Sequence, residues 1–268
     1  MNITKRCIIF FIFILLPASV LFAQQPSIAV DTTDYLDSEL YEEEASVSYG
    51  WLGGGFYIGY FIPDLTDFNK NIAQPFVGQN LDEQVLLFGG RGFMPFPYVR
   101  NLRIGGLGYG GTTERCCVDT TASTGQDVTR SLKYSIGYGA LTIDYALPIA
   151  VRRMFFLFGV ELGLGGIDIE AKQAAKRLAF DIQTEFDNPT TNITHTYSAG
   201  FFLVKPQLQI EYAPTNFLML QLAAGYQITP MGIWKVDGDV DLGNTDKLSN
   251  INGSGLVFNF GVNIGFFQ

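Results

Sequence analysis

Segments in which apolar side chains occupy every other position recur through most of this chain. A period of two predicts β-strands with two different faces, because successive side chains of a strand point to opposite sides. Eight such segments can be read, at 50–62, 84–94, 101–111, 141–147, 156–164, 202–212, 218–228 and 256–266. In most of them one face is apolar throughout and the opposite face is polar or glycine-rich.

The connections between these segments alternate strictly between short and long. The short ones are 95–100, 148–152 and 213–215, and the long ones are 63–83, 112–129, 168–194 and 229–253. In an up-and-down meander this pattern places every short turn at one end and every long loop at the other. Short periplasmic turns and long outer loops are typical of transmembrane barrels. The predicted fold is therefore all-β, an eight-stranded antiparallel up-and-down transmembrane β-barrel.

Aromatic side chains gather beside the short turns and at the end of the chain. They are Phe96, Tyr98, Tyr145, Phe155, Phe156, Tyr212, Phe217, Phe266 and Phe267. On the predicted topology they collect at one level, as an interfacial aromatic girdle does.

Six charged residues fall on the strand face opposite the apolar one. They are Arg91, Arg103, Asp144, Glu161, Lys205 and Glu211. A charge that faces lipid near the bilayer centre costs about 2–4 kcal/mol, so these side chains are predicted to face the barrel interior. Buried charges of both signs must pair. Because eight strands leave just enough room for side chains, a packed interior is favoured over a conduit, and a soluble barrel would have the opposite polarity.

Glycines occupy several positions on the outward face of the early strands, among them Gly54, Gly90, Gly92, Gly106 and Gly108. They offer little apolar area to lipid. Such glycines mark a bend, close packing or a contact between subunits, and the sequence does not choose among these.

The N-terminus has the layout of a secretory signal peptide. Lys5 and Arg6 precede an apolar run that ends near Ala23, and the run is shorter than the roughly 20 residues of a spanning helix. The predicted domains are a signal peptide at 1–23, an acidic flexible lead-in at 24–49 and a barrel at 50–268. Cleavage would leave 15 basic and 26 acidic residues, a net charge of −11. This negative charge disfavours nucleic acid as a partner.

Few residues are suited to catalysis or metal binding. Cys116 and Cys117 are adjacent, and they could form a disulfide or remain inert thiols. His195 is the sole histidine, and Ser198, three residues further, is expected on the opposite strand face, which separates a base from its nucleophile. We expect neither a metal nor a cofactor. Helical spacing at 65–72 and 178–186 predicts short amphipathic helices in two of the long loops.

The last strand alternates apolar residues up to the chain end: Phe258, Phe260, Val262, Ile264 and Phe266. With the signal peptide, the eight strands and the alternating loops, this resembles the small outer-membrane barrels such as the membrane domain of outer membrane protein A. The resemblance covers 50–267 and implies Sec-type export, a place in the bacterial outer membrane and recognition of the last strand by the barrel-insertion machinery. Phe267 and Gln268 depart from the family pattern, in which the terminal residue is aromatic.

The function predicted from this reading is non-catalytic: a structural, adhesive or ligand-contacting role of the external loops, in contact with outer-membrane lipid. Two alternatives stay open, a lipid-modifying enzyme at the outer rim and a narrow channel or small-molecule transporter. The external ligand, the oligomeric state and the role of the acidic segment 31–44 are not specified by the sequence.

Overall fold

The computed structural model describes residues 51–82, 84–121, 127–148, 153–175, 193–238, 240–241 and 253–267. The predicted signal peptide, the acidic lead-in and the predicted helix at 178–186 lie outside these residues.

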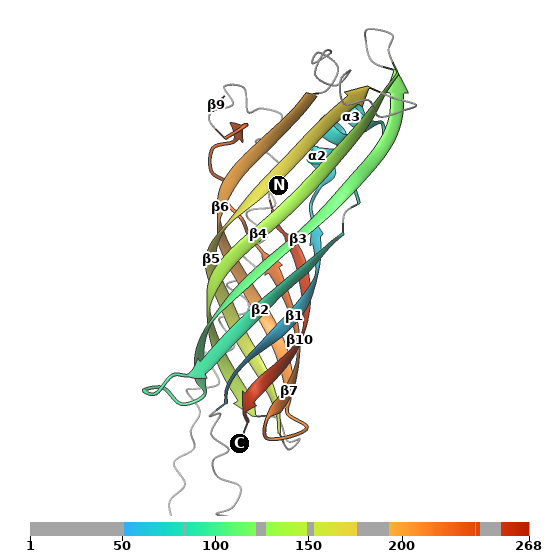
Figure 1. Ribbon diagram of the computed structural model, residues 1–268. Coiled ribbons are helices and arrows are strands. Elements are labelled where there is room, and N and C mark those ends of the chain that lie inside the picture. The colour runs from blue at the N-terminus through green and yellow to red at the C-terminus, as the bar shows by residue number, and fades with distance from the viewer. Residues whose placement is uncertain are drawn as a thin grey trace, which may run out of the picture. The chain divides into compact units, whose positions relative to one another are not determined.

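Eight antiparallel strands form a closed ring. They are β1 (Leu52–Pro63), β2 (Val85–Pro95), β3 (Leu102–Thr121), β4 (Asp127–Pro148), β5 (Met154–Ala175), β6 (Ile193–Tyr212), β7 (Leu218–Gln227) and β10 (Gly255–Phe266). Each strand pairs with the next, and β10 pairs with β1 from Leu52↔Phe266 to Pro63↔Gly255, which closes the ring (Figure 1). The prediction of an eight-stranded up-and-down barrel is confirmed. Two short strands, β8 (Lys235–Val236) and β9 (Val240–Asp241), add a ribbon to the upper part of β6.

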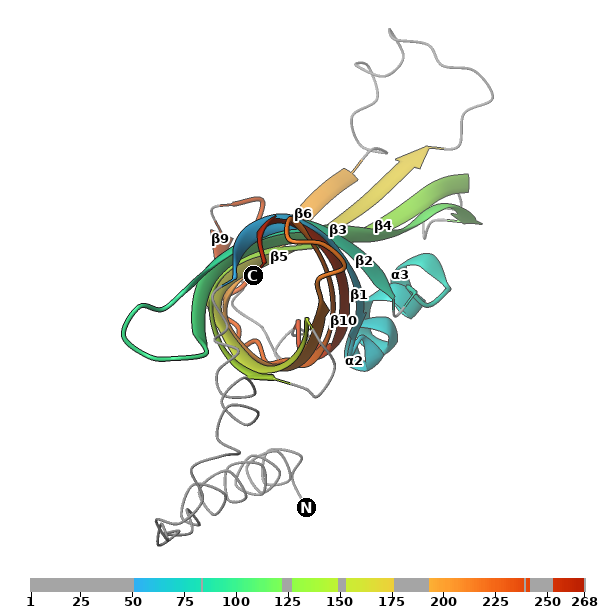
Figure 2. The same ribbon diagram turned by 90° about the horizontal axis from the view of Figure 1, so that it is seen from below.

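Four of the strands are much longer than predicted. β3 to β6 have 20 to 22 residues each, whereas β1, β2, β7 and β10 have 10 to 12. The expected loops at 112–129 and 168–194 are wrong over most of their described residues, which belong to these strands. The extra residues still alternate, with Leu132, Tyr134 and Ile136 buried on one face, but their other face is polar. We call residues 112–136 and 166–200 of β3 to β6, where described, the projecting sheet (Figures 1 and 2).

The barrel wall has the polarity that the sequence predicts. Even-numbered residues of β10 face outward, and Phe258, Phe260, Val262, Ile264 and Phe266 are 39 to 72% exposed. Odd-numbered residues of the same strand, such as Asn259 and Asn263, are buried inside. The aromatic girdle is only partly correct, because Phe155 and Phe267 point inward and are buried. Phe267 follows the last outward residue, so the alternation itself turns it into the interior.

Three short helical segments connect β1 to β2. They are α2 (Thr66–Phe68), η2 (Asn69–Ala73) and α3 (Gln74–Val77), and they occupy the predicted helix at 65–72 and the residues after it. The Asn69 amide accepts a hydrogen bond from the Leu81 backbone N–H (2.8 Å) and donates one to the Leu81 carbonyl (3.2 Å), which ties the segment to its own end. No helix within the described ranges is long and apolar enough to cross a membrane.

Candidate functional site

The barrel interior holds a compact network of charges at its middle level. Arg103 donates from Nε to Asp144 (3.0 Å) and from Nη1 to Glu211 (2.7 Å), and Arg91 forms an ion pair with Asp144. These side chains are at most 2% exposed. Arg103 therefore joins β3 to β4 and β6, and its planar guanidinium can satisfy two carboxylates at once.

Lys205 and Glu161 form a second interior ion pair. They are direct neighbours in the register of β5 and β6, and Nζ lies 2.7 Å from Oε2. The ammonium also lies 5.7 Å from the ring centroid of Tyr109 and 5.9 Å from that of Tyr138. Both aromatic rings lie within the distance at which a ring face stabilises a cation.

Neutral polar groups complete the network. They were not among the interior residues predicted from the sequence. Gln209 donates to Asp144 Oδ1 (2.6 Å) and accepts from Arg91 (3.1 Å). Tyr57 donates to Asn263 Oδ1 (2.8 Å). All of them lie at inward-facing positions of their strands, so the alternation of side chains could have placed them in the barrel interior. Which of them bond to one another depends on the register of the barrel and could not be predicted.

Apolar layers lie on either side of this network. At the short-turn end, Trp51 packs edge-on against Phe155 (centroids 4.7 Å apart) and Phe267 (5.5 Å), and Phe93 lies under the Arg103 guanidinium at 4.2 Å. At the opposite end a larger core of buried residues includes Phe61 and Leu203 from the barrel wall. The buried carboxylates are thus separated from solvent at both ends.

The inner face of the projecting sheet is covered by the helices between β1 and β2. Phe68 contacts Tyr134 edge-on, with centroids 6.2 Å apart. Arg130 donates to the Phe76 carbonyl (2.9 Å), and its guanidinium lies 5.1 Å from the Phe76 ring. Figure 2 shows the helices beside the ring, against the strands that leave it. This packing explains why the sheet continues beyond the barrel: its apolar face has a partner.

The outer face of the projecting sheet changes character at one row of residues. Gly110, Gly137, Gly166 and Gly200 lie side by side in register. One row nearer the short turns are Leu164 and Phe202, which are 70% and 46% exposed. One row further out are Thr112, Ser135, Asp168 and Ser198. The glycine row therefore marks the upper limit of the apolar band of the exterior.

His195 lies on the projecting part of β6 and contacts the turn between β8 and β9. Its Nδ1 lies 2.9 Å from Asp237 Oδ2, and the Thr196 backbone N–H donates to Asp237 Oδ1 (2.8 Å). That backbone hydrogen bond, followed by the one to His195, lowers the pKa of Asp237 below its ordinary value. Ser198 is on the opposite strand face. No hydroxyl or thiol within the described residues is hydrogen-bonded to the imidazole.

Cys116 is disulfide-bonded and lies at a register shift between Arg115 and Val118. The side chain of Cys117 lies outside what the structure describes, so the pairing of the two cysteines stays a prediction. The described residues contain no group of three or more histidine, cysteine or acidic side chains placed to hold a metal ion.

A closed ring of strands with an apolar exterior and a charged, packed interior defines the class of this protein: it is a small transmembrane β-barrel. Neither a protein-family model nor a curated protein matches its sequence.

Solved structures with a similar chain path include outer-membrane proteins of different activities. Ail, the attachment invasion locus protein of Yersinia pestis, is 12% identical with a TM-score of 0.32, and the match covers 82% of this chain and 97% of that one. A major outer membrane protein from Thermus thermophilus is 8% identical (TM-score 0.39; 80% and 99% covered). The outer membrane protease OmpT from Escherichia coli is also 8% identical (TM-score 0.26; 81% and 93% covered).

Proposed function

We propose that this protein is exported through the Sec pathway, inserted into the bacterial outer membrane and anchored there by its barrel, so that the projecting sheet contacts an external partner. The role is non-catalytic, adhesive or ligand-contacting. The observation that carries the proposal is the projecting sheet itself, whose outer face is polar and which extends beyond the apolar band of the wall.

The open edge of β3 in this sheet indicates how a partner would bind. β2 pairs with β3 only as far as Leu87↔Gly111, and within the described residues no strand continues along that side of β3 from Thr112 to Arg115, where the Arg115 side chain contacts Asn80 and Asp82. An unpaired strand edge presents backbone N–H and C=O groups to an incoming chain. An extended peptide segment of the partner can therefore add to β3 as a further strand.

The interior and the rim favour this role over the two alternatives. The carboxylates at the middle level are paired and enclosed between apolar layers, an arrangement that opposes ion flow. His195 has an acidic partner in Asp237, but no hydroxyl or thiol within the described residues is hydrogen-bonded to it. The narrow channel and the lipid-modifying enzyme therefore rank below the contact role.

Two neighbouring proline variants test the edge. Along a strand, consecutive residues direct their N–H groups to opposite sides, so of Thr112 and Thr113 one faces β4 and the other faces the free edge. Proline at the edge-facing position should leave the barrel folded but reduce adhesion of expressing cells to surfaces coated with extracellular-matrix proteins. Proline at the other position breaks a ladder hydrogen bond and serves as the folding control. Expressing cells that adhere no better than cells without the protein would contradict the role.

The membrane placement has its own test. The detergent-purified chain should migrate faster unboiled than boiled on a denaturing gel, and protease added to intact cells should cut only at the end that carries the projecting sheet. Equal mobility together with solubility in the absence of detergent would contradict outer-membrane insertion.

A further inference from the structure

A patch of glycines covers the outside of three neighbouring strands. Seven of them share the outward face of β2, β3 and β4, and we call this patch the glycine face: Gly90, Gly92, Gly106, Gly108, Gly110, Gly137 and Gly139. They adjoin one another in register, as in Gly92↔Gly106, Gly108↔Gly139 and Gly110↔Gly137. The backbone of the sheet is therefore bare over a continuous area of the exterior.

No contact within the described residues requires these seven residues to be glycine. A Cβ added to any of them would lie 3.4 to 4.0 Å from its nearest neighbour, which is ordinary contact. Gly261, which faces inward, is different, because a Cβ there would come within 2.2 Å of the Tyr57 ring. Glycine weakens a strand, and a lipid-facing position gains from an apolar side chain. The packing of the described residues therefore does not account for the glycine face.

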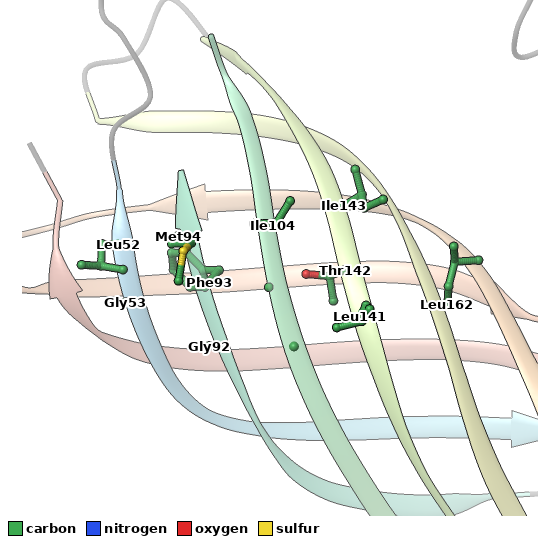
Figure 3. Close-up of a pocket in the computed structure, with 12 residues that line it drawn as sticks. Leu52, Gly53, Gly92, Phe93, Met94, Ile104, Leu141, Thr142, Ile143 and Leu162 are labelled. Atoms are coloured by element: carbon green, nitrogen blue, oxygen red, sulfur yellow. The ribbon is translucent and has the colours of Figure 1, made fainter. Parts of the chain in front are cut away.

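The surface around the glycine face is uneven. At its upper end Phe56 and Phe88 stand out as a stacked pair, with centroids 6.4 Å apart, beside Gly90 and Gly110. At its lower end lies an apolar groove of about 650 Å³ with Gly92 and Gly106 in its lining (Figure 3). Met94 and Leu141 are among the apolar side chains along this groove.

We propose that the glycine face is a contact surface for a second copy of this chain in the membrane. In an isologous dimer of two copies inserted in the same direction, the two glycine faces meet at the same depth, and the glycines let the two backbones approach closely. Lipid is as apolar as leucine, so association in a membrane depends on such close packing, and small residues mark the helical interfaces that achieve it.

The available area fits a dimer of moderate stability. Six large side chains around the glycine face are 44 to 71% exposed: Leu52, Phe56, Phe88, Met94, Leu141 and Leu164. At roughly 200 Å² for each side chain they present about 700 Å². A standard protein interface takes about 800 Å² from each partner, and the glycines add to the sum.

Energy transfer between donor-labelled and acceptor-labelled copies in lipid vesicles tests the proposal over a range of protein-to-lipid ratios. The wild type should show transfer that falls on dilution with lipid. Gly108→Leu and Gly139→Leu should raise the dissociation constant about tenfold or more, because each places a side chain between the two backbones. Ala224→Leu makes a comparable enlargement on the outward face of β7 and should leave the constant unchanged.

Heat-modifiable mobility of every variant checks that the barrel is folded. Gly108→Cys provides a second readout, since it should form a crosslink between copies under a short bifunctional reagent, whereas Ala224→Cys should not. Transfer that is absent at every ratio, or glycine variants that match Ala224→Leu, would overturn the proposal. So would a monomer that retains a lipid in native mass spectra and loses it in the glycine variants.

Discussion

The ammonium of Lys205 on β6 lies 2.7 Å from the carboxylate of Glu161, its register neighbour on β5, and both side chains are at most 1% exposed. This ion pair lies in the packed interior of a barrel whose outside is apolar, so neither charge can turn to water if the other is removed. The consequence is a strong dependence of stability on the pair as a unit.

Removing one partner of this pair should be far more damaging than removing both. Glu161→Leu leaves a buried lysine without its carboxylate and should lower the free energy of unfolding by about 3–5 kcal/mol, whereas Glu161→Leu with Lys205→Met should recover most of the loss. Urea unfolding in lipid vesicles measures this. Glu170→Gln, which breaks an ion pair with the 53%-exposed Lys172, is the control and should have little effect on stability.

Arg103→Lys should also destabilise the barrel although it conserves the charge. One ammonium cannot bond Asp144 and Glu211 with the geometry of the guanidinium, and a carboxylate left without its donor costs about 1–3 kcal/mol or more. Arg115→Lys at the exposed pair with Asp82 is the matched control and should have little effect. Equal midpoints of the two variants in urea would show that Arg103 is not held by both acids.

The purified protein should show no stable single-channel steps in planar bilayers. The apolar layers that contain Trp51, Phe155 and Phe267 at one end and Phe61 at the other enclose the charged level. Regular conductance steps from the wild type would contradict this assignment and support the channel alternative. A porin reconstituted in parallel verifies the sensitivity of the assay.

The contact between Asp237 and β6 should weaken in acid. The pKa of Asp237 is lowered by the Thr196 N–H and by His195, so the contact stabilises the β8–β9 turn above the carboxyl's ordinary pKa of 3.8 and is lost as the pH falls through the lower folded value. Hydrogen exchange at Thr196 should speed up over that range beyond its intrinsic pH dependence. Asp237→Asn should abolish this extra change, and a wild type that behaves like the variant would refute the assignment.

His195→Ala should leave the lipid A of expressing cells unchanged in mass spectra. The imidazole contacts Asp237 and lies 6.5 Å from the Tyr197 ring, but no nucleophile within the described residues is bonded to it. A modification of lipid A that requires the protein and disappears in the variant would instead establish catalysis through His195.

The alternation of side chains was sufficient to predict the ring, its antiparallel order and the inward direction of all six charged residues. Parity alone decides these features, because a strand has only two faces. Which acid pairs with which base could not be predicted. Arg103 and Glu211 are 108 positions apart in the sequence and lie on strands that are not neighbours. The shear of the barrel decides which interior side chains meet.

The length of β3 to β6 was missed for a different reason. Around Ser135 and Asp168 the outward residues change from apolar to polar, and this change resembles the start of a loop. Tyr134 and Ile169 continue the apolar inward face, which was a signal that could have been read. This apolar face can be explained only once the helices that cover it are known. A strand that extends beyond the lipid needs other parts of the protein to pack against its apolar face.

The continuity of β4 and β5 has a mechanical consequence for the proposed contact role. The two strands pair without interruption from Val128↔Ala175 in the projecting sheet to Pro148↔Phe155 at the far end of the barrel. Tension applied at the outer tip along the strand axes acts on this ladder in shear, so many hydrogen bonds resist together instead of parting one by one. A partner that pulls away from the cell would therefore strain its own contact with the sheet before it could unravel the sheet from the barrel.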